Sequence, residues 1–157
     1  MRKSFTRLFS VLVLLLLSIQ LVMAAPTLKT SGGLSPSDGG TVASAPNPVF
    51  TMNFQAAVAP VAGQIIGLYN NSGLVKSIQL RPVDADTING AIVFSHTDGT
   101  VTFNGSVVTI LFKDVTWAQG VSYWITVGSS AIKDPADGKS FDPTLPANFG
   151  NNGRWDF

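Results

Sequence analysis

The chain has 157 residues with no cysteine and no glutamate, and its ten Lys and Arg against nine Asp give a formal charge of +1. Without cysteine there is no disulfide, no thiolate metal site, no thiol nucleophile and no lipidated cysteine of a bacterial lipoprotein. Because Asp favours turns and Glu favours helices, the composition also disfavours a helical fold.

The N-terminus has the three-part pattern of a secretory signal peptide. It begins with three basic residues, Arg2, Lys3 and Arg7. An apolar centre follows at 11–17, and small residues follow it at Ala24 and Ala25. We predict a signal peptide over 1–24 with cleavage after Ala24, and cleavage after Ala25 is the alternative.

An uncleaved membrane anchor is the competing interpretation of the same segment. A helix that spans a bilayer needs about 20 mostly apolar residues. Here Ser18 and Gln20 interrupt the apolar run and Pro26 follows it, so we favour cleavage. The mature chain then keeps seven Lys and Arg against nine Asp, a formal charge of −2. This charge gives no electrostatic footprint for nucleic acid and no polybasic membrane patch, and we expect no stable membrane insertion after cleavage.

After the signal peptide, the composition predicts a short leader and one domain. Residues 25–33 contain few large apolar side chains and are predicted to be a flexible leader, and residues 34–157 to be one domain. A turn is predicted at 35–40, since Pro36 presets φ and Asp38 can bond its own backbone.

Period-two alternation and turn residues then predict eight short strands in chain order. The predicted strands are 50–54, 64–69, 74–80, 91–94, 101–103, 106–112, 123–127 and 154–157. Asn104-Gly105 is the strongest hairpin signal between two of them. No stretch of the mature chain keeps a helical period for three turns.

Seven or eight short strands with frequent turns are typical of an all-β sandwich or barrel. We favour a Greek-key sandwich because the connections at 56–63, 81–90 and 134–153 are long enough to cross between two sheets. Eight residues on matching strand faces are predicted to form one core between the sheets: Phe50, Met52, Phe54, Val108, Ile110, Phe112, Tyr123 and Ile125.

In order and spacing, the chain resembles the SbsA-type bacterial Ig-like domains of S-layer and other exported proteins. The matching blocks are the turn and valine at 35–42, the strand at 48–54, Gly120-x-x-Tyr123-x-Ile125, the Asp-rich loop at 131–141, and Trp155-x-Phe157. Two features depart from the family pattern. The loop at 133–139 is longer and lacks its usual Asn, and the segment 142–153 is long.

The residues themselves suggest a tyrosine corner at Tyr123. This residue enters a predicted strand directly after a turn, where a Greek-key sandwich uses a Tyr whose hydroxyl bonds back to the backbone. An ordinary half-buried Tyr is the alternative.

No arrangement in the sequence predicts catalysis, cofactor binding or a tight metal site. His96 is the only histidine and lies where a strand runs into a turn, so we expect an exposed polar residue rather than a triad base. Asp134, Asp137 and Asp142 lack the spacing and the Glu of a calcium loop, and a solvated turn with Asp134 capping amides is favoured over calcium binding. We therefore predict no catalytic, cofactor-binding or metal residues, and no cofactor.

The three tryptophans raise the possibility of carbohydrate binding, because sugars stack on exposed aromatic rings. Trp124 is predicted to face outward, opposite Tyr123 and Ile125. We nevertheless expect Trp124 and Trp155 to be partly packed, Trp117 to lie in a turn, and the three to form no common platform.

The resemblance implies an exported, non-enzymatic Ig-like protein with a structural or adhesive role at the bacterial cell surface. A carbohydrate- or protein-binding module on the same sandwich is the alternative. The expected location is secreted or surface-bound, and the expected partners are cell-surface proteins or cell-wall polysaccharide. The sequence alone does not separate a lone domain from one piece of a longer surface protein.

Overall fold

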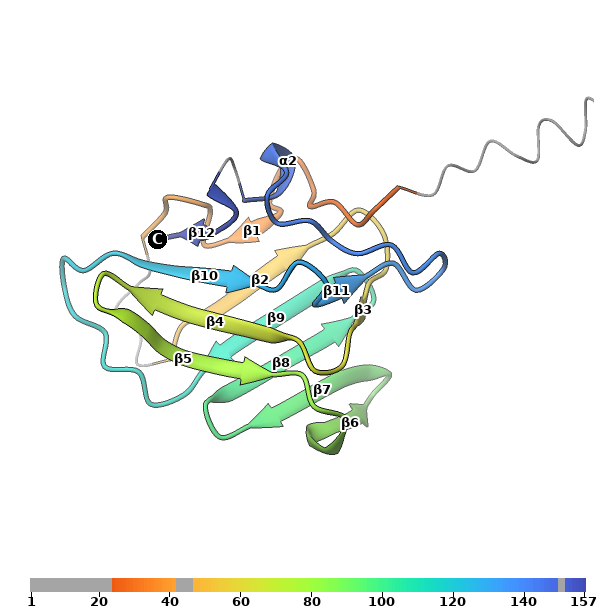
Figure 1. The fold of residues 1–157 in the computed structure, drawn as a ribbon, viewed down its shortest axis with the longest axis horizontal. Helices are drawn as coiled ribbons and strands as arrows, with labels where there is room; N and C mark the ends of the chain where they lie inside the picture. Colours follow the sequence, from red (N-terminus) through yellow and green to blue (C-terminus); the bar gives the residue numbers. More distant parts are fainter. Residues whose placement is uncertain (1–23, 42–46, 150–151) are drawn as a thin grey trace, which may run out of the picture.

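The computed structural model describes residues 24–41, 47–149 and 152–157. Its strands form two antiparallel sheets packed against a shared apolar core, and one sheet lies in front of the other in Figure 1. The predicted all-β sandwich is therefore confirmed. Apart from Ala24, the predicted signal peptide lies outside the described residues.

The larger sheet has six strands in the order β1-β2-β9-β8-β7-β6, and every neighbouring pair is antiparallel. Its strands are β1 (Leu34–Ser35), β2 (Val49–Asn53), β6 (Ala85–Ile88), β7 (Ala91–His96), β8 (Gly99–Asn104) and β9 (Val107–Phe112).

The smaller sheet has four strands in the order β12-β10-β4-β5. Its strands are β4 (Ile65–Asn70), β5 (Gly73–Gln79), β10 (Tyr123–Val127) and β12 (Trp155–Asp156). A two-stranded ladder pairs β3 (Ala59–Pro60) with β11 (Ile132–Lys133). The 3-10 helix η1 (Pro82–Asp84) and the short α2 (Pro146–Phe149) complete the elements.

All eight predicted strands are present, but the described residues hold twelve strands rather than seven or eight. The additional strands are β1, β3 and β11, with two residues each, and β6, whose four residues are all exposed. Strands that are very short or fully exposed show no alternation of buried and exposed positions, so the sequence pattern does not predict them.

Two of the three predicted crossings between the sheets are confirmed. The segment 56–63 leads from β2 to β4, and 81–90 leads from β5 back to β6 and β7. The prediction for 134–153 was wrong, because this segment ends at β12, which pairs with β10 in the same sheet. The third crossing is instead the loop 113–122, between β9 and β10.

The core lies between the inward faces of the two sheets. All eight predicted core residues are buried, seven of them with no exposed area, and Tyr123 is 6% exposed. Six of them lie on or beside β2 and β9 of the larger sheet. Tyr123 and Ile125 lie on β10 and pack with the other inward residues of the four-stranded sheet, including Ile66, Leu68, Ile78 and Trp155. The alternation of β9 between buried and half-buried positions therefore reflects contact with the core on one face only.

The predicted flexible leader at 25–33 differs from the structure. Leu28 is only 3% exposed and bridges Phe54 beside β2. The N–H of Lys29 donates to the Asn53 carbonyl at 2.9 Å, and the N–H of Leu28 donates to the Asn148 side chain at 3.2 Å. One large apolar residue in a polar stretch is enough to anchor the segment, because its burial removes that side chain from water.

The predicted turn at 35–40 joins the start of the domain to its last strand. The indole N–H of Trp155 donates to the Pro36 carbonyl at 2.9 Å, and the N–H of Asp156 donates to the Asp38 carboxylate at 2.8 Å. Residues 27–39 thus contact β2 in one sheet and β12 in the other, which covers that side of the sandwich.

The edge strand β6 is held by a hairpin that the sequence analysis did not identify. Its turn residues Asn89 and Gly90 both have positive φ, 52° and 81°, as a two-residue type I′ turn requires. The N–H of Thr87 bonds the Asp86 carboxylate, and the N–H of Ala85 bonds the Pro82 carbonyl. These bonds use donors that an edge strand would otherwise offer to another chain.

Candidate ligand-binding face

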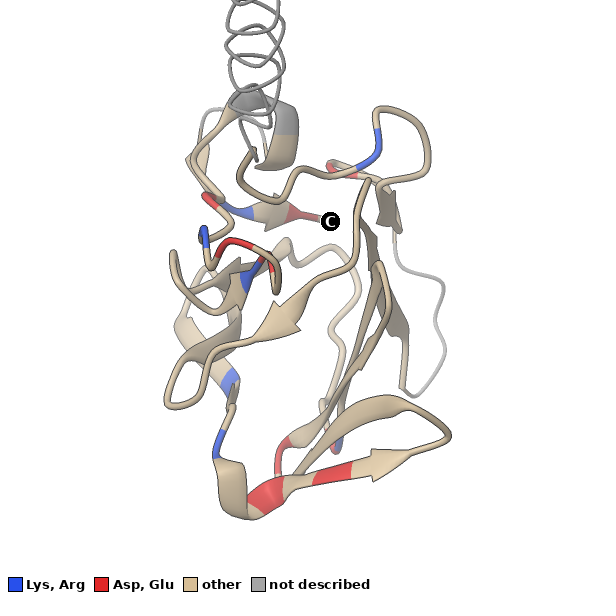
Figure 2. Ribbon diagram, turned by 90° about the vertical axis from the view of Figure 1, so that its right-hand side faces the viewer, with Lys and Arg blue, Asp and Glu red and all other residues tan. Residues whose placement is uncertain are grey.

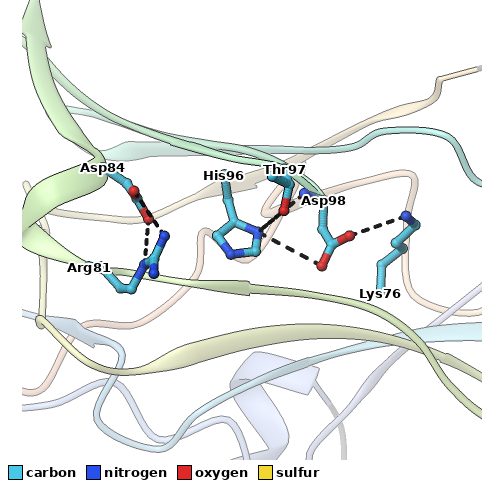
Figure 3. A network of polar contacts seen from close by, with 6 residues as sticks. All are labelled: Lys76, Arg81, Asp84, His96, Thr97 and Asp98. Carbon is cyan, nitrogen blue, oxygen red and sulfur yellow. Dashed lines mark hydrogen bonds and ion pairs between the residues drawn. The ribbon is translucent and has the colours of Figure 1, made fainter.

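His96 lies at the end of β7, half-buried rather than exposed as predicted. Its Nδ1 accepts the N–H of Asp98 at 3.2 Å and lies 3.4 Å from the Thr97 hydroxyl (Figure 3). In the described part of the chain these two residues are the polar partners of the imidazole, and neither is a serine held for attack. The histidine therefore organises a turn.

The carboxylate of Asp98 joins this turn to the other sheet. It forms an ion pair with Lys76 on β5 at 3.1 Å, and it lies 3.8 Å from the imidazole of His96 (Figure 3). Nearby, the Arg81 guanidinium bonds both carboxylate oxygens of Asp84, at 2.7 and 3.1 Å, across η1. Lys76 is also an inward-pointing charge on an edge strand, a feature that discourages strand addition.

Each carboxylate in the Asp-rich loop bonds the backbone of its own turn. Asp134 accepts the N–H of Ala136 at 2.7 Å, as the solvated-turn interpretation predicts, and Asp137 accepts the N–H of Lys139 at 2.9 Å. Within the described ranges, no three His, Cys, Asp or Glu side chains are grouped to hold a metal ion.

Calcium is expected to leave the melting temperature unchanged. A ligand that binds only the native state must raise its apparent stability, and the Asp-rich loop offers carboxylates already used by backbone amides. Melting curves in calcium and in chelator should superimpose. A rise of many degrees in calcium would contradict this expectation.

The pKa of the Asp142 carboxyl is lowered from its ordinary value of 3.8. The main cause is the hydrogen bond from the Thr144 hydroxyl, at 2.6 Å, followed by the bond from the Thr144 N–H, at 2.9 Å. Because the folded-state pKa is lowered, this bonding stabilises the fold above pH 3.8 and is lost as the pH falls through the folded-state pKa.

Thr144→Val is expected to raise the pKa of Asp142 towards its ordinary value, because it removes the hydroxyl and keeps the backbone bond. A carboxyl-carbon NMR titration of the folded protein measures this directly. An unchanged pKa in the variant would show that the hydroxyl is not the cause.

Tyr123 forms the tyrosine corner that the sequence suggests. Its hydroxyl accepts the N–H of Ala118 at 3.0 Å and lies 3.5 Å from the Thr116 carbonyl. The ring is buried and meets Trp117 edge to face, at 4.9 Å between centroids. This residue therefore fixes the path of the crossing loop 113–122 rather than binding a ligand.

Tyr123→Phe is expected to cost about 1–3 kcal/mol of unfolding free energy, because it leaves the Ala118 N–H without its acceptor. Urea denaturation measures the loss. The matched control Tyr69→Phe removes a hydroxyl that has no hydrogen bond in the described structure, and it should cost far less. Equal losses in the two variants would contradict the tyrosine-corner interpretation.

The three tryptophans do not share a surface, as predicted. Trp155 is fully buried, and Trp117 lies in the irregular loop before β10, packed against Phe50 and Tyr123. Trp124 is half-buried and faces away from the core, because it alternates with buried Tyr123 and Ile125 on β10.

The sequence analysis missed the neighbours of Trp124. Tyr69 on β4 is its cross-strand partner, and their rings are nearly parallel, 8° apart with centroids separated by 6.1 Å. The guanidinium carbon of Arg154 lies 4.5 Å from the centroid of the Trp124 ring. We call Tyr69, Trp124 and Arg154 the aromatic face; it lies on the outer side of the four-stranded sheet.

Gly67 makes room for this arrangement. A Cβ at position 67 would lie 2.7 Å from a ring carbon of Tyr69 and 3.3 Å from the Thr126 hydroxyl. The Tyr69 ring therefore occupies the space above the glycine, on the same side of the sheet as Trp124. Only a residue without a side chain allows this close approach.

Polar groups border the aromatic face at β12. Asp156 forms an ion pair with Arg154 at 2.8 Å and accepts the side-chain amide of Asn152 at 2.7 Å. On the opposite border, Leu74 on β5 is the cross-strand partner of Tyr69 on β4, and it is 58% exposed. The aromatic face and the Asp156 carboxylate at its border thus place two aromatic rings, a cation and a carboxylate side by side across the sheet.

A separate cavity of about 490 Å³ lies between residues 27–34 and α2. Two of its polar lining side chains are already bonded within the protein. Asn148 bonds Leu28 and the Asp142 carbonyl, and Asp38 bonds Asp156. The aromatic face is the better candidate for ligand binding, because its two large aromatic residues are only half-buried.

No family model, curated protein or solved structure matches this chain. Among the described residues, none of the helices has the length and apolar character needed to cross a bilayer. Basic and acidic residues are interspersed along the ribbon in Figure 2.

Proposed function

We propose that the protein is exported and acts as a non-enzymatic, Ig-like β-sandwich with a structural or adhesive role at the bacterial cell surface. Cleavage after Ala24, with Ala25 as the alternative, would release it by the general secretory route. The resemblance to SbsA-type domains supports this proposal and stays a prediction.

One observation carries the proposal, namely how the chain uses its polar side chains. His96, Asp98 and the Asp-rich loop all bond turns or join the sheets. Among the described aromatic residues, Tyr69 and Trp124 of the aromatic face are the two that lie outside the core. A fold that uses its titratable groups for structure and exposes aromatic rings is better suited to binding another molecule at its surface than to catalysis.

A ligand-binding module on the same sandwich is the second candidate, and the aromatic face favours it. Trp, Tyr and Arg are the residues that most often dominate binding energies at interfaces. Tyr69, Trp124 and Arg154 bring these three types together on a half-exposed surface.

Two measurements test the proposal. N-terminal sequencing of exported material should find Ala25 or Pro26 first, and Met1 retained in membrane fractions would contradict cleavage. The mature protein should also sediment with envelope fragments of the source bacterium. Failure to sediment at any protein concentration tested would reject the surface role.

A further inference from the structure

We infer that the aromatic face binds a neutral polysaccharide chain, with Tyr69 and Trp124 stacking on sugar rings. This inference rests on the proposed function, since the cell surface supplies the polymer. It adds the site and the chemical class of ligand.

The first argument is that the aromatic pair lies outside the core. Neither Tyr69 nor Trp124 belongs to the buried cluster, and both rings keep exposed area. Three neighbouring outward positions on the same sheet are occupied by small residues, Gly67, Thr126 and Ser77, while Leu74 lies beside Tyr69 on β5. Two large rings among small neighbours form a raised apolar surface that water does not favour and a ligand can cover.

The second argument is the geometry of the rings. Their planes differ by 8°, so both present surfaces of the same orientation. The apolar C–H side of a sugar ring is flat and packs on such surfaces, while its hydroxyls point to the sides. Arg154 lies over one face of Trp124, so we expect the sugar to contact the Tyr69 ring and the part of the indole next to it.

The third argument is the polar border. Asp156 carries a carboxylate, Arg154 a guanidinium and Asn152 an amide, and all three lie at the β12 side of the rings. These planar groups offer paired donors or acceptors, the pattern that neighbouring sugar hydroxyls match. The border can therefore orient a sugar that the rings hold.

Charge and apolar content select among possible partners. Arg154 is already paired with Asp156, and the mature chain has a formal charge of −2, so a polyanion gains little here. Among the described residues, the exposed large aliphatic side chains on this side of the sheet are Leu74, paired with Tyr69, and Ile65 at the start of β4. A protein interface needs a wider apolar core, which favours the polysaccharide.

The test uses the purified mature protein, residues 25–157, and its variants. The probes are protease-treated cell-wall sacculi, for sedimentation, and a soluble N-acetylglucosamine tetramer, for tryptophan fluorescence titration. Untreated envelopes serve as the third probe. The variants are Tyr69→Leu, Trp124→Ala and the control Val83→Ala, a residue in η1 that is 84% exposed. Melting temperatures are measured for all.

Wild type and Val83→Ala are expected to bind sacculi and tetramer alike. Tyr69→Leu and Trp124→Ala should bind roughly tenfold more weakly or not at all, because each removes a stacking ring. Trp124 also packs on Arg154 beside β12, so Tyr69→Leu, which fills the space over Gly67, is the deciding variant if Trp124→Ala melts early.

Three results would overturn the inference. Full binding by Tyr69→Leu would show that the ring is not used. Binding to untreated envelopes that is lost when the envelopes are treated with protease, with no binding to either sugar probe, would identify a protein partner and leave the proposed surface role intact. Binding to none of the three probes would reject both the inference and the proposed role.

Discussion

Replacing Phe112 by alanine is expected to lower the free energy of unfolding by about 3–5 kcal/mol. Phe112 ends β9, has no exposed area, and meets Phe50 edge to face at 6.3 Å between centroids. Removal of the ring loses its transfer free energy and leaves a cavity that close-packed neighbours fill only in part. Urea denaturation of the mature protein measures the change.

The control for this experiment is Val83→Ala. Val83 is 84% exposed in η1, so its truncation should change stability by less than about 0.5 kcal/mol. A change of that small size in Phe112→Ala would show that the inward face of β9 is assigned wrongly.

Gly99→Ala is the second substitution with a large expected effect, a loss of about 3 kcal/mol or more. Gly99 begins β8 and is buried. A Cβ there would overlap the carbonyl oxygen of Leu111 on β9, and it would lie 2.8 Å from the end of Ile78 on the opposite sheet. The overlap is with backbone, so relief requires strands β8 and β9 to separate.

Gly120→Ala is the matched control, because Gly120 has a φ of 75° and nothing within 4 Å of the added Cβ. It should cost only the conformational penalty, about 1–2 kcal/mol. Thermal melts of both variants, checked by urea denaturation, compare them. Similar losses at the two positions would mean that the contact at Leu111 relaxes easily.

Phe112 belongs to an aromatic cluster around Phe50, in which distant segments of the chain meet. The ring of Phe50 lies 5.6 Å from that of Trp155 and 4.6 Å from that of Phe157, between centroids. Trp117, which lies in the crossing loop, has its ring centroid 6.1 Å from that of Phe50. The second strand, the crossing loop and the end of the chain therefore depend on one another, and we expect them to unfold together.

Much of the fold could be predicted because alternation is a local property. On β2 and β9, every second residue is large and apolar, and those residues are the buried ones. The predicted hairpin at Asn104-Gly105 also joins the expected strands, β8 and β9. In both cases the deciding residues are adjacent in sequence.

The predictions that failed depend on contacts between distant residues. Leu28 is held by Phe54 and Asn148, and nothing in residues 25–33 reports those partners. Likewise, the long segment 134–153 leads from the two-stranded ladder at β11 to the four-stranded sheet, where β12 pairs with β10. Such pairings depend on packing free energy summed over the whole sandwich rather than on local propensity.

The aromatic face likewise has one feature that could be predicted from the sequence and one that depends on contacts between distant residues. The alternation of β10 determined from sequence alone that Trp124 faces away from the core, and the turn at 119–122 suggested the tyrosine corner at Tyr123. Only the tertiary structure decided that Tyr69, 55 residues earlier, lies beside Trp124 and that Arg154 covers it. The physical reason is that a strand's own sequence sets which side chains face outward, whereas the packed core sets which strands are neighbours.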